Sequence, residues 1–301
     1  MDRCDFLPVS AEEMHERGWW WYDALVVGGD AYVDHPSFGT AVISRVLEAE
    51  GLRVAVLAQP DWHNAEAFRA MGRPRLGVFI GAGNLDSMVA HYTAAKRRRS
   101  EDFYSPGKRT GCRPDRAAIV YCNRAREAFG PDVPIILGSL EASLRRFAHY
   151  DYWDDSVRRA ILFDAPADLL VYGMGEAATI EIAHRLKKKQ SVHTMTDIPG
   201  TGYITRDPAE CKFEHVTLPS YEDVRDDKRL YAEATRTEYA EHDPVRGRAM
   251  IQPCEGRYLV INPPAMPLDT KELDRVADLP YTREWHPMYE PLGGVPAIEE
   301  V

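Results

Sequence analysis

Residues 138–176, GSLEASLRRFAHYDYWDDSVRRAILFDAPADLLVYGMGE, decide the fold of this chain. Two turns rich in glycine and glutamate occur in the stretch, and each follows a short apolar run, VPIIL before Gly138 and DLLVY before Gly173. Helix-compatible segments follow both turns, so we expect each turn at the C-terminal end of a strand in an open α/β sheet, the edge where such sheets bind ligands. The candidate binding residues of the two turns are Gly138, Glu141, Ser143, Gly173, Gly175 and Glu176.

Strand and helix signals alternate through the first 190 residues. A helical pattern over 36–50 follows the first apolar run, and Gly51 supplies its stop. Strands are predicted at 24–29, 53–59, 76–82, 116–121, 133–139, 160–165 and 168–173. This order predicts a doubly wound, mostly parallel Rossmann-like sheet, with a long polar loop over 94–115.

The organisation changes after about residue 190. We therefore expect a Rossmann-like domain over 1–190 and a smaller mixed α/β segment over 191–301. Within the second segment, the charged stretch 221–243 predicts one long helix, and the run that begins at Arg257 predicts an edge strand stopped by Pro263 and Pro264. The Pro- and Gly-rich tail over 285–301 is expected to be poorly anchored without a natural continuation.

Composition indicates a globular protein with enough apolar material for a sizeable core. Of the 301 residues 45% are hydrophobic, and the formal net charge of −10 does not favour nonspecific binding to nucleic acid. One basic run, 96–99 (KRRR), is either a solvated patch or a contact to RNA or phosphate. No apolar run approaches the ~20 residues of a membrane span, and the start of the chain lacks the pattern of a secretory signal. The five cysteines are scattered, which suits a reducing compartment better than a disulfide framework. The predicted location is therefore the cytoplasm.

The segment 28–39, GGDAYVDHPSFG, holds the other candidate binding residues. Gly28 and Gly29 would let the backbone approach a ligand, Asp30 and Asp34 could accept hydrogen bonds, and His35 could bind a metal or transfer a proton. In the alternative interpretation, Asp34 caps the helix that begins near Pro36 and His35 simply packs.

The glutamates of the two turns also have alternative interpretations. The turn at Gly138 could bind an anion at a helix N-terminus, helped by Arg145 and Arg146. Alternatively, Ser139 is an N-cap, Glu141 is a first-turn acid, and the arginines pair with the acids of 151–155. Glu176 could bond to a cofactor or a partner backbone, or it could stabilise only its own helix.

Five stretches closely resemble the N-terminal region of the YgiQ-type radical SAM proteins. They are GDAYVDHPSFG (29–39), LEAEGLRVAVLAQPDW (47–62), AGNLDSMVAHYTAAKRRRSEDFYSPG (82–107), EASLRRFAHYDYWDDSVRR (141–159) and RYLVINPPAMPLDTKELDRVADLPY (257–281). Members of that family carry a CxxxCxxC motif whose thiolates hold a 4Fe-4S cluster that binds S-adenosylmethionine. The resemblance implies that the full-length protein binds both and cleaves S-adenosylmethionine, on a substrate that it does not identify.

This chain has no CxxxCxxC motif, because its cysteines stand at 4, 112, 122, 211 and 254. In the family the motif follows shortly after a segment like VPAIEEV (295–301), so the chain resembles an accessory half that ends just before its catalytic barrel. The resemblance implies this barrel as the partner. No catalytic residue and no metal ligand is predicted within these 301 residues.

Related radical SAM proteins carry a cobalamin-binding-domain-like sheet at their N-terminus. Their lower axial pattern is DxHxxG, whereas here Asp34 and His35 are adjacent and Gly39 lies four residues beyond the histidine. The spacing therefore does not predict cobalamin on His35. The alternative to an accessory domain is a stand-alone module that binds a small molecule or anion near Asp34, Glu141 and Glu176 without catalysis.

Overall fold

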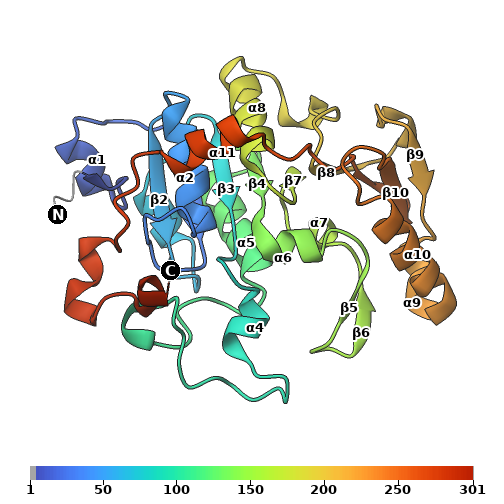
Figure 1. The fold of residues 1–301 in the computed structure, drawn as a ribbon, viewed down its shortest axis with the longest axis horizontal. Coiled ribbons are helices and arrows are strands. Elements are labelled where there is room, and N and C mark those ends of the chain that lie inside the picture. The colour runs from blue at the N-terminus through green and yellow to red at the C-terminus, as the bar shows by residue number, and fades with distance from the viewer. Residues whose placement is uncertain (1–4, 301) are drawn as a thin grey trace.

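One nine-stranded sheet organises the protein (Figure 1). The computed structural model describes residues 5–300, and its strand order is β2-β1-β3-β4-β7-β8-β11-β10-β9. The first five of these strands are parallel: β2 (Val54–Ala58), β1 (Ala24–Gly28), β3 (Gly77–Ile80), β4 (Ile135–Leu137) and β7 (Leu169–Val171). The doubly wound, mostly parallel α/β fold is thereby confirmed.

Strand alternation divides the core between the two faces of this sheet. In β1, Leu25 and Val27 face one buried cluster, whereas Ala24 and Val26 face the other. The first cluster is shared with α3 (Glu66–Ala70), α5 (Ala117–Phe129), α6 (Ser139–Leu144) and α7 (Ile161–Asp164), and the second with α2 (Gly39–Ala49) and α8 (Glu176–Lys187). α1 (Ala11–Glu16) contributes Met14 to the first cluster, and α4 (Ser87–His91) lies beside this core.

The sheet continues beyond residue 190 with a change of direction. β8 (Thr201–Thr205) pairs antiparallel with β7, and it is followed in the sheet by β11 (Arg257–Ile261), β10 (Ala249–Cys254) and β9 (His215–Thr217). β5 (His149–Asp151) and β6 (Ser156–Arg158) form a separate hairpin. One sheet therefore runs through both predicted segments, and their division into separate domains stays a prediction.

Two predicted strands are helices. The run 116–121 opens α5, whose buried residues Ala118, Cys122 and Ala125 continue the helical spacing as far as Phe129. The run 160–165 is the single turn α7, which ends before Pro166. Both errors have one cause, because a short apolar run does not by itself distinguish a strand from a buried helix.

Two predictions for the second segment are also wrong. The stretch 221–243 forms two helices, α9 (Tyr221–Asp226) and α10 (Lys228–Ala240), because Asp227 is extended and its side chain accepts the Arg229 N–H at 2.7 Å. β11 stops at Ile261, before the prolines, but it lies between β8 and β10 rather than at an edge. The tight β10–β11 turn at Glu255 and Gly256 places it there.

The tail is anchored, contrary to expectation. His286 N–H donates to Tyr32 O at 3.0 Å, and Tyr32 N–H donates to Tyr289 Oη at 2.9 Å. Further along, Gly107 N–H donates to Gly294 O and Ala297 N–H donates to Phe103 O, each at 3.0 Å. The tail thus packs on the loops that follow the parallel strands.

A strap over residues 262–282, which contains α11 (Thr270–Ala277), links β11 to this tail across the outside of α8 (Figure 1). Among the residues that the structure describes, no helix is both long enough and apolar enough to cross a membrane.

We predict that Gly29→Ala destabilises the protein by on the order of 3 kcal/mol. A Cβ at Gly29 would overlap the carbonyl group of Ala82, which is backbone and has little room to move. Gly39→Ala is the matched control, since no heavy atom lies within 4 Å of its added Cβ, and it should be neutral or slightly stabilising. Urea unfolding of both variants measures the difference, and equal stabilities would contradict this account of the β1–β3 approach.

Candidate functional site

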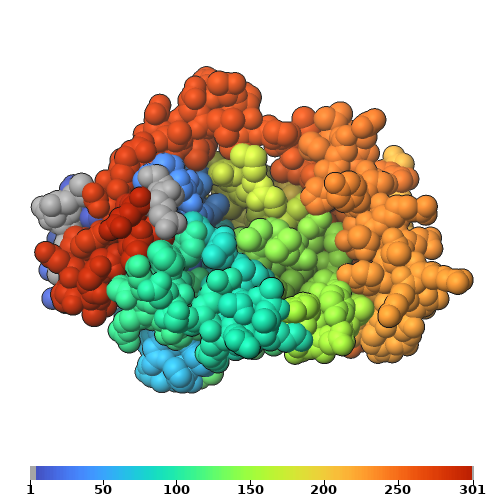
Figure 2. Space-filling view, turned by 60° about the horizontal axis from the view of Figure 1, so that its bottom comes forward, coloured from blue at the N-terminus to red at the C-terminus, as the bar shows by residue number. Residues whose placement is uncertain are grey.

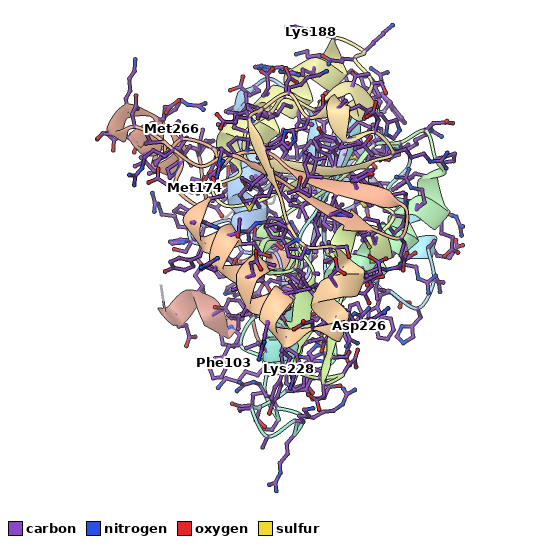
Figure 3. All side chains as sticks on the ribbon, turned by 90° about the vertical axis from the view of Figure 1, so that its right-hand side faces the viewer. Phe103, Met174, Lys188, Asp226, Lys228 and Met266 are labelled. Atoms are coloured by element: carbon purple, nitrogen blue, oxygen red, sulfur yellow. The ribbon has the colours of Figure 1, made fainter. Side chains whose placement is uncertain are left out.

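A cleft of about 330 Å³ opens at the C-terminal edge of the parallel strands. It lies between the first turns of α2 and α8, where the strand order reverses between β1 and β3, and this position is typical of ligand sites in doubly wound sheets. In Figure 2 the blue α2 and yellow α8 segments flank a hollow beneath the red strap. Figure 3 shows Met174 and Lys188 at opposite ends of α8, with Met174 at the lip of the cleft.

The inside of the cleft is apolar and its polar groups are mostly hydroxyls. Val26, Phe79, Ile136 and Val171 from four parallel strands line it, together with Ile43 of α2. The polar side chains are those of Ser37, Thr40, Ser139, Thr179 and Glu176. Among residues 5–300, Glu176 is the single ionisable residue of the lining. The described part of the cleft could therefore bind and orient a molecule, but it offers no pair of groups for acid–base catalysis.

The structure brings the two predicted glycine turns together. Gly138, Gly173, Gly175 and Glu176 all line the cleft, although 35 residues separate the two turns in sequence. Gly175 has a structural reason to lack a side chain, because its Cβ would lie 3.0 Å from Val171 Cγ1. Whether these residues bind a ligand stays a prediction.

Glu176 is the most unusual polar group of the cleft. Its Oε2 is buried and has no hydrogen-bond partner, and the Tyr281 hydroxyl on the strap is likewise buried without one. Burial, together with the carboxylates of Asp34 and Glu176, raises the pKa of Tyr281 to about 12. Glu176 also lines a second cavity, of about 350 Å³, that separates α8 from α11.

Gly28, Gly29 and Asp30 lie beside the cleft rather than in its lining. A Cβ at Gly28 would lie 2.6 Å from Thr40 Oγ1, so this glycine lets α2 pack closely on the end of β1. Asp30 is buried, and its Oδ1 accepts from Arg113 at 2.6 Å while its Oδ2 accepts the Asn84 N–H at 2.6 Å.

Arg113 joins Asp30 to the long loop over 94–115. Its second nitrogen donates to Asp102 Oδ2 at 2.7 Å, and Ser105 Oγ donates to the same carboxylate at 2.8 Å. Gln59 Nε2 in turn donates to Ser105 Oγ at 2.7 Å. The loop is therefore fixed to the end of β1 by a buried ionic network, of which Asp30 is a structural member.

Asp34 does not cap α2. The cap position is Phe38, and Asp34 is instead fully buried in an ion pair with Arg45. Its Oδ2 also accepts the Thr282 N–H at 3.1 Å, which ties the strap to the β1 loop. His35 is half-buried outside the cleft lining, where its Nδ1 accepts the Ser37 N–H at 3.1 Å, and burial lowers its pKa.

Glu141 is enclosed by backbone. Its Oε2 accepts Ser87 N–H at 3.1 Å and Ser87 O–H at 2.7 Å, and its Oε1 accepts the Ala118 N–H at 3.3 Å. Burial raises its pKa. Its position holds the starts of α4 and α5 together, so it does not reach the cleft. Ser143 Oγ donates to the carbonyl of Ser139 at 2.9 Å and also lies outside the lining.

The turn at Gly138 has no cation beside it in the cleft. Arg145 pairs with Asp86, and Arg146 contacts His242 Nδ1 at 3.0 Å, so neither pairs with the acids of 151–155 as the alternative interpretation expected. Gly138 is the cap residue, and Ser139 is the first helical residue with a φ of 73°. Its Oγ accepts the Ala82 N–H at 3.0 Å.

The cysteines do not form a cluster site. Cys122 and Cys254 are buried apart in α5 and β10, and Cys112 and Cys211 are free and half-buried. Within residues 5–300, no group of three His, Cys, Asp or Glu residues is placed to hold a metal ion. Cys4 lies outside the described residues. The residues described therefore do not fit a 4Fe-4S cluster.

Several residues of the site escaped sequence reasoning. Thr40 and Ile43 lie on the predicted helix over 36–50, but the pattern there indicated only a core face. Thr179 likewise lines the cleft from a helix, α8, where the pattern indicated only a core face. Outside the lining, Arg113 reaches Asp30 over 83 residues of chain, and no local signal marks such a pair.

The fold is that of a doubly wound α/β domain with a cleft at the ends of its parallel strands. The chain matches the family described as radical SAM N-terminal over residues 6–301, so it belongs to that family. The sequence resemblance is thereby confirmed.

Curated relatives are much longer than this chain. A UPF0313 protein of Clostridium botulinum (strain 657 / Type Ba4) is 52% identical over 301 residues, which are 100% of this chain and 47% of that protein. A UPF0313 protein of Clostridium perfringens (strain SM101 / Type A) is 53% identical over the same length, which is 45% of that protein. The chain thus spans about half the length of these relatives.

Two solved structures of TsrM, a radical S-adenosylmethionine methyltransferase from Kitasatospora setae, are also similar. One holds tryptophan substrate and a SAM analog; it is 21% identical, with a TM-score of 0.37, over 60% of this chain and 28% of that chain. The other holds cobalamin and a 4Fe-4S cluster; it is 19% identical, with a TM-score of 0.37, over 60% of this chain and 26% of that chain.

We predict that Arg113→Met lowers the free energy of unfolding by about 3 to 5 kcal/mol, because it leaves two buried carboxylates without their shared cation. Arg246→Met is the matched control. The Arg246 side chain is 84% exposed and its ion pair with Asp243 lies at the surface, so the change should stay within about 0.5 kcal/mol. Urea unfolding tests both, and a loss below about 1 kcal/mol for Arg113→Met would contradict the role of the network.

A second prediction concerns pH. Burial raises the pKa of Asp30 to about 6 against the pull of Arg113, while the unfolded chain has the ordinary value of about 3.9. Between these two values the folded state binds more protons, so the contribution of Asp30 to stability is present at pH 4 and is lost as the pH rises through 6.

Asp30→Asn removes this contribution. The stability of the unmodified protein minus that of Asp30→Asn should fall by about 2 to 3 kcal/mol between pH 4 and pH 7, measured by urea unfolding at each pH. A difference that rises with pH would show that Asp30 ionises more easily in the folded state than in the unfolded chain.

Proposed function

We propose that this chain is the accessory N-terminal domain of a radical SAM enzyme and that its cleft holds a small organic molecule beside the catalytic domain. The observation that carries the proposal is the cleft itself, which is built from the turns after β1, β3, β4 and β7 within a chain of the radical SAM N-terminal family.

The position of the tail supports a catalytic domain at the same edge of the sheet. Residues 294–297 bond to the backbone of Phe103 and Gly107, which belong to the loop fixed by Arg113 at the end of β1. In a protein as long as the clostridial relatives, a domain that follows residue 300 would begin beside the cleft. The domain would then cover the open side of the cleft.

The chemistry of the reaction is assigned to that other domain. By family resemblance, it would hold the 4Fe-4S cluster and support reductive cleavage of S-adenosylmethionine, since the cysteines described here do not fit a cluster. The residues of this chain would bind and orient a molecule through the cleft. We give His35 no part as a cobalamin ligand, because it lies outside the cleft lining.

A stand-alone binding module is the second candidate. The whole lining of the cleft comes from this chain, so the site needs no partner residue to be formed. Under this hypothesis the domain binds its ligand without taking part in catalysis.

Anaerobic reconstitution with iron and sulfide tests the leading proposal. We expect the full-length Clostridium botulinum relative to bind one 4Fe-4S cluster and, with dithionite as electron donor, to convert S-adenosylmethionine to methionine and 5′-deoxyadenosine. The 301-residue chain, treated in parallel as the control, should retain no stoichiometric cluster. A relative that neither binds a cluster nor cleaves S-adenosylmethionine would overturn the accessory role and leave the binding module.

A further inference from the structure

We propose that the cleft selects a ligand with an apolar body and N–H or O–H donors, neutral or cationic, and that it rejects ligands that place an anionic group against Glu176. This inference rests on the proposed function, because it names the chemistry of the molecule that the cleft would hold.

The apolar body follows from the shape and the lining of the cleft. α2 and α8 pack against each other over one face of the sheet, and the cleft lies between their first turns and the ends of the parallel strands. Its lining includes Phe79 and aliphatic side chains of the neighbouring strands, among them Val26 and Ile136. A mostly apolar group gains the most from the area it buries in such a cleft.

The charge preference follows from what surrounds Glu176. Among residues 5–300, no Lys, Arg or His lines the cleft, and Arg145 and Arg146 contact Asp86 and His242 instead. In the second cavity beside Glu176, His184 and Arg275 are both paired with Glu50. An anionic ligand group would therefore meet a carboxylate with no cation to offset the repulsion. A donor would instead form a charge-assisted hydrogen bond with Glu176.

The helix N-termini beside the cleft do not reverse this preference. The first N–H of α2, from Gly39, already donates to Asn84 Oδ1 at 3.2 Å. At α8, Glu176 itself stands in the first turn and offsets the positive end of that helix. Asn84 and Glu176 therefore offset part of the positive charge at these two helix ends.

One unpartnered oxygen marks the polar part of the cleft. Among the described residues, nothing donates a hydrogen bond to the buried Oε2 of Glu176. A buried acceptor without a partner is costly, so a ligand that supplies a donor to this oxygen gains from it.

Benzamidine, benzamide and benzoate test the inference, since they share one ring and differ in a cationic, a neutral and an anionic head group. Each is titrated into the 301-residue chain and followed by NMR. Shifts of the Gly138, Gly173 and Gly175 amides place the binding in the cleft. We expect benzamidine to bind on the order of ten-fold more tightly than benzoate, with benzamide between them.

Glu176→Gln should remove the preference while it keeps the shape of the side chain. The benzamidine affinity should fall to that of benzamide, and benzoate should bind no more weakly than before. Glu181→Gln, on the same helix but outside the cleft lining, is the matched control and should leave the order unchanged. Tyr281→Phe keeps the carboxylate, so the order by charge should survive in that variant as well.

Each result decides the inference. Tightest binding of benzoate, or an order that is the same in Glu176→Gln, overturns the charge preference while leaving a cleft that binds ligands. Failure of all three probes to shift the cleft amides overturns the ligand class altogether. The accessory role fails separately, through the cluster and S-adenosylmethionine assays on the full-length relative.

Discussion

The buried guanidinium of Arg113 is the interaction on which the functional edge of this protein depends. It bonds to Asp30 at the end of β1 and to Asp102 in the long loop, and so it joins two segments that share no secondary structure. Isolated buried charges are costly, and these three tolerate burial because Arg113 pairs with both carboxylates, which also accept bonds from Asn84 and Ser105. Since Phe103 and Gly107 of the same loop hold the tail, the order of the C-terminal residues also follows from this network.

A second constraint keeps the cleft open at this well-packed edge. Gly28 allows α2 to approach the end of β1, and Gly29 allows the β1 and β3 loops to meet. These close approaches fix the walls, while the slot between α2 and α8 receives no large side chain from the turns at Gly138 and Gly173. Small residues therefore serve two purposes here: some permit contact between backbones, and others leave the space in which a ligand fits.

The sequence allowed the fold class and the meeting place of the turns to be predicted, but it did not reveal which polar groups are accessible. Local patterns were enough to predict the parallel strands, because an apolar run followed by a glycine turn marks the place where a strand ends. They failed at 116–121, where the helical spacing becomes visible only beyond Tyr121. They could not show that Asp34 would be buried against Arg45, since that depends on how the strap and the β1 loop pack in three dimensions.

The contrast between Glu141 and Glu176 shows why sequence alone could not choose between binding residue and structural acid. Both glutamates follow a parallel strand and a glycine turn, and both stand in the first turn of a helix. Ser87 donates to Oε2 of Glu141 and the Ala118 N–H of α5 donates to its Oε1, so this carboxylate stabilises the junction of α4 and α5. No loop closes over Glu176 in that way; only the strap approaches, and it leaves Oε2 without a donor. Which of the two roles such a glutamate takes therefore depends on the segment that covers it, and in this protein the long-range packing satisfies Glu141 and leaves Oε2 of Glu176 without a donor among the described residues.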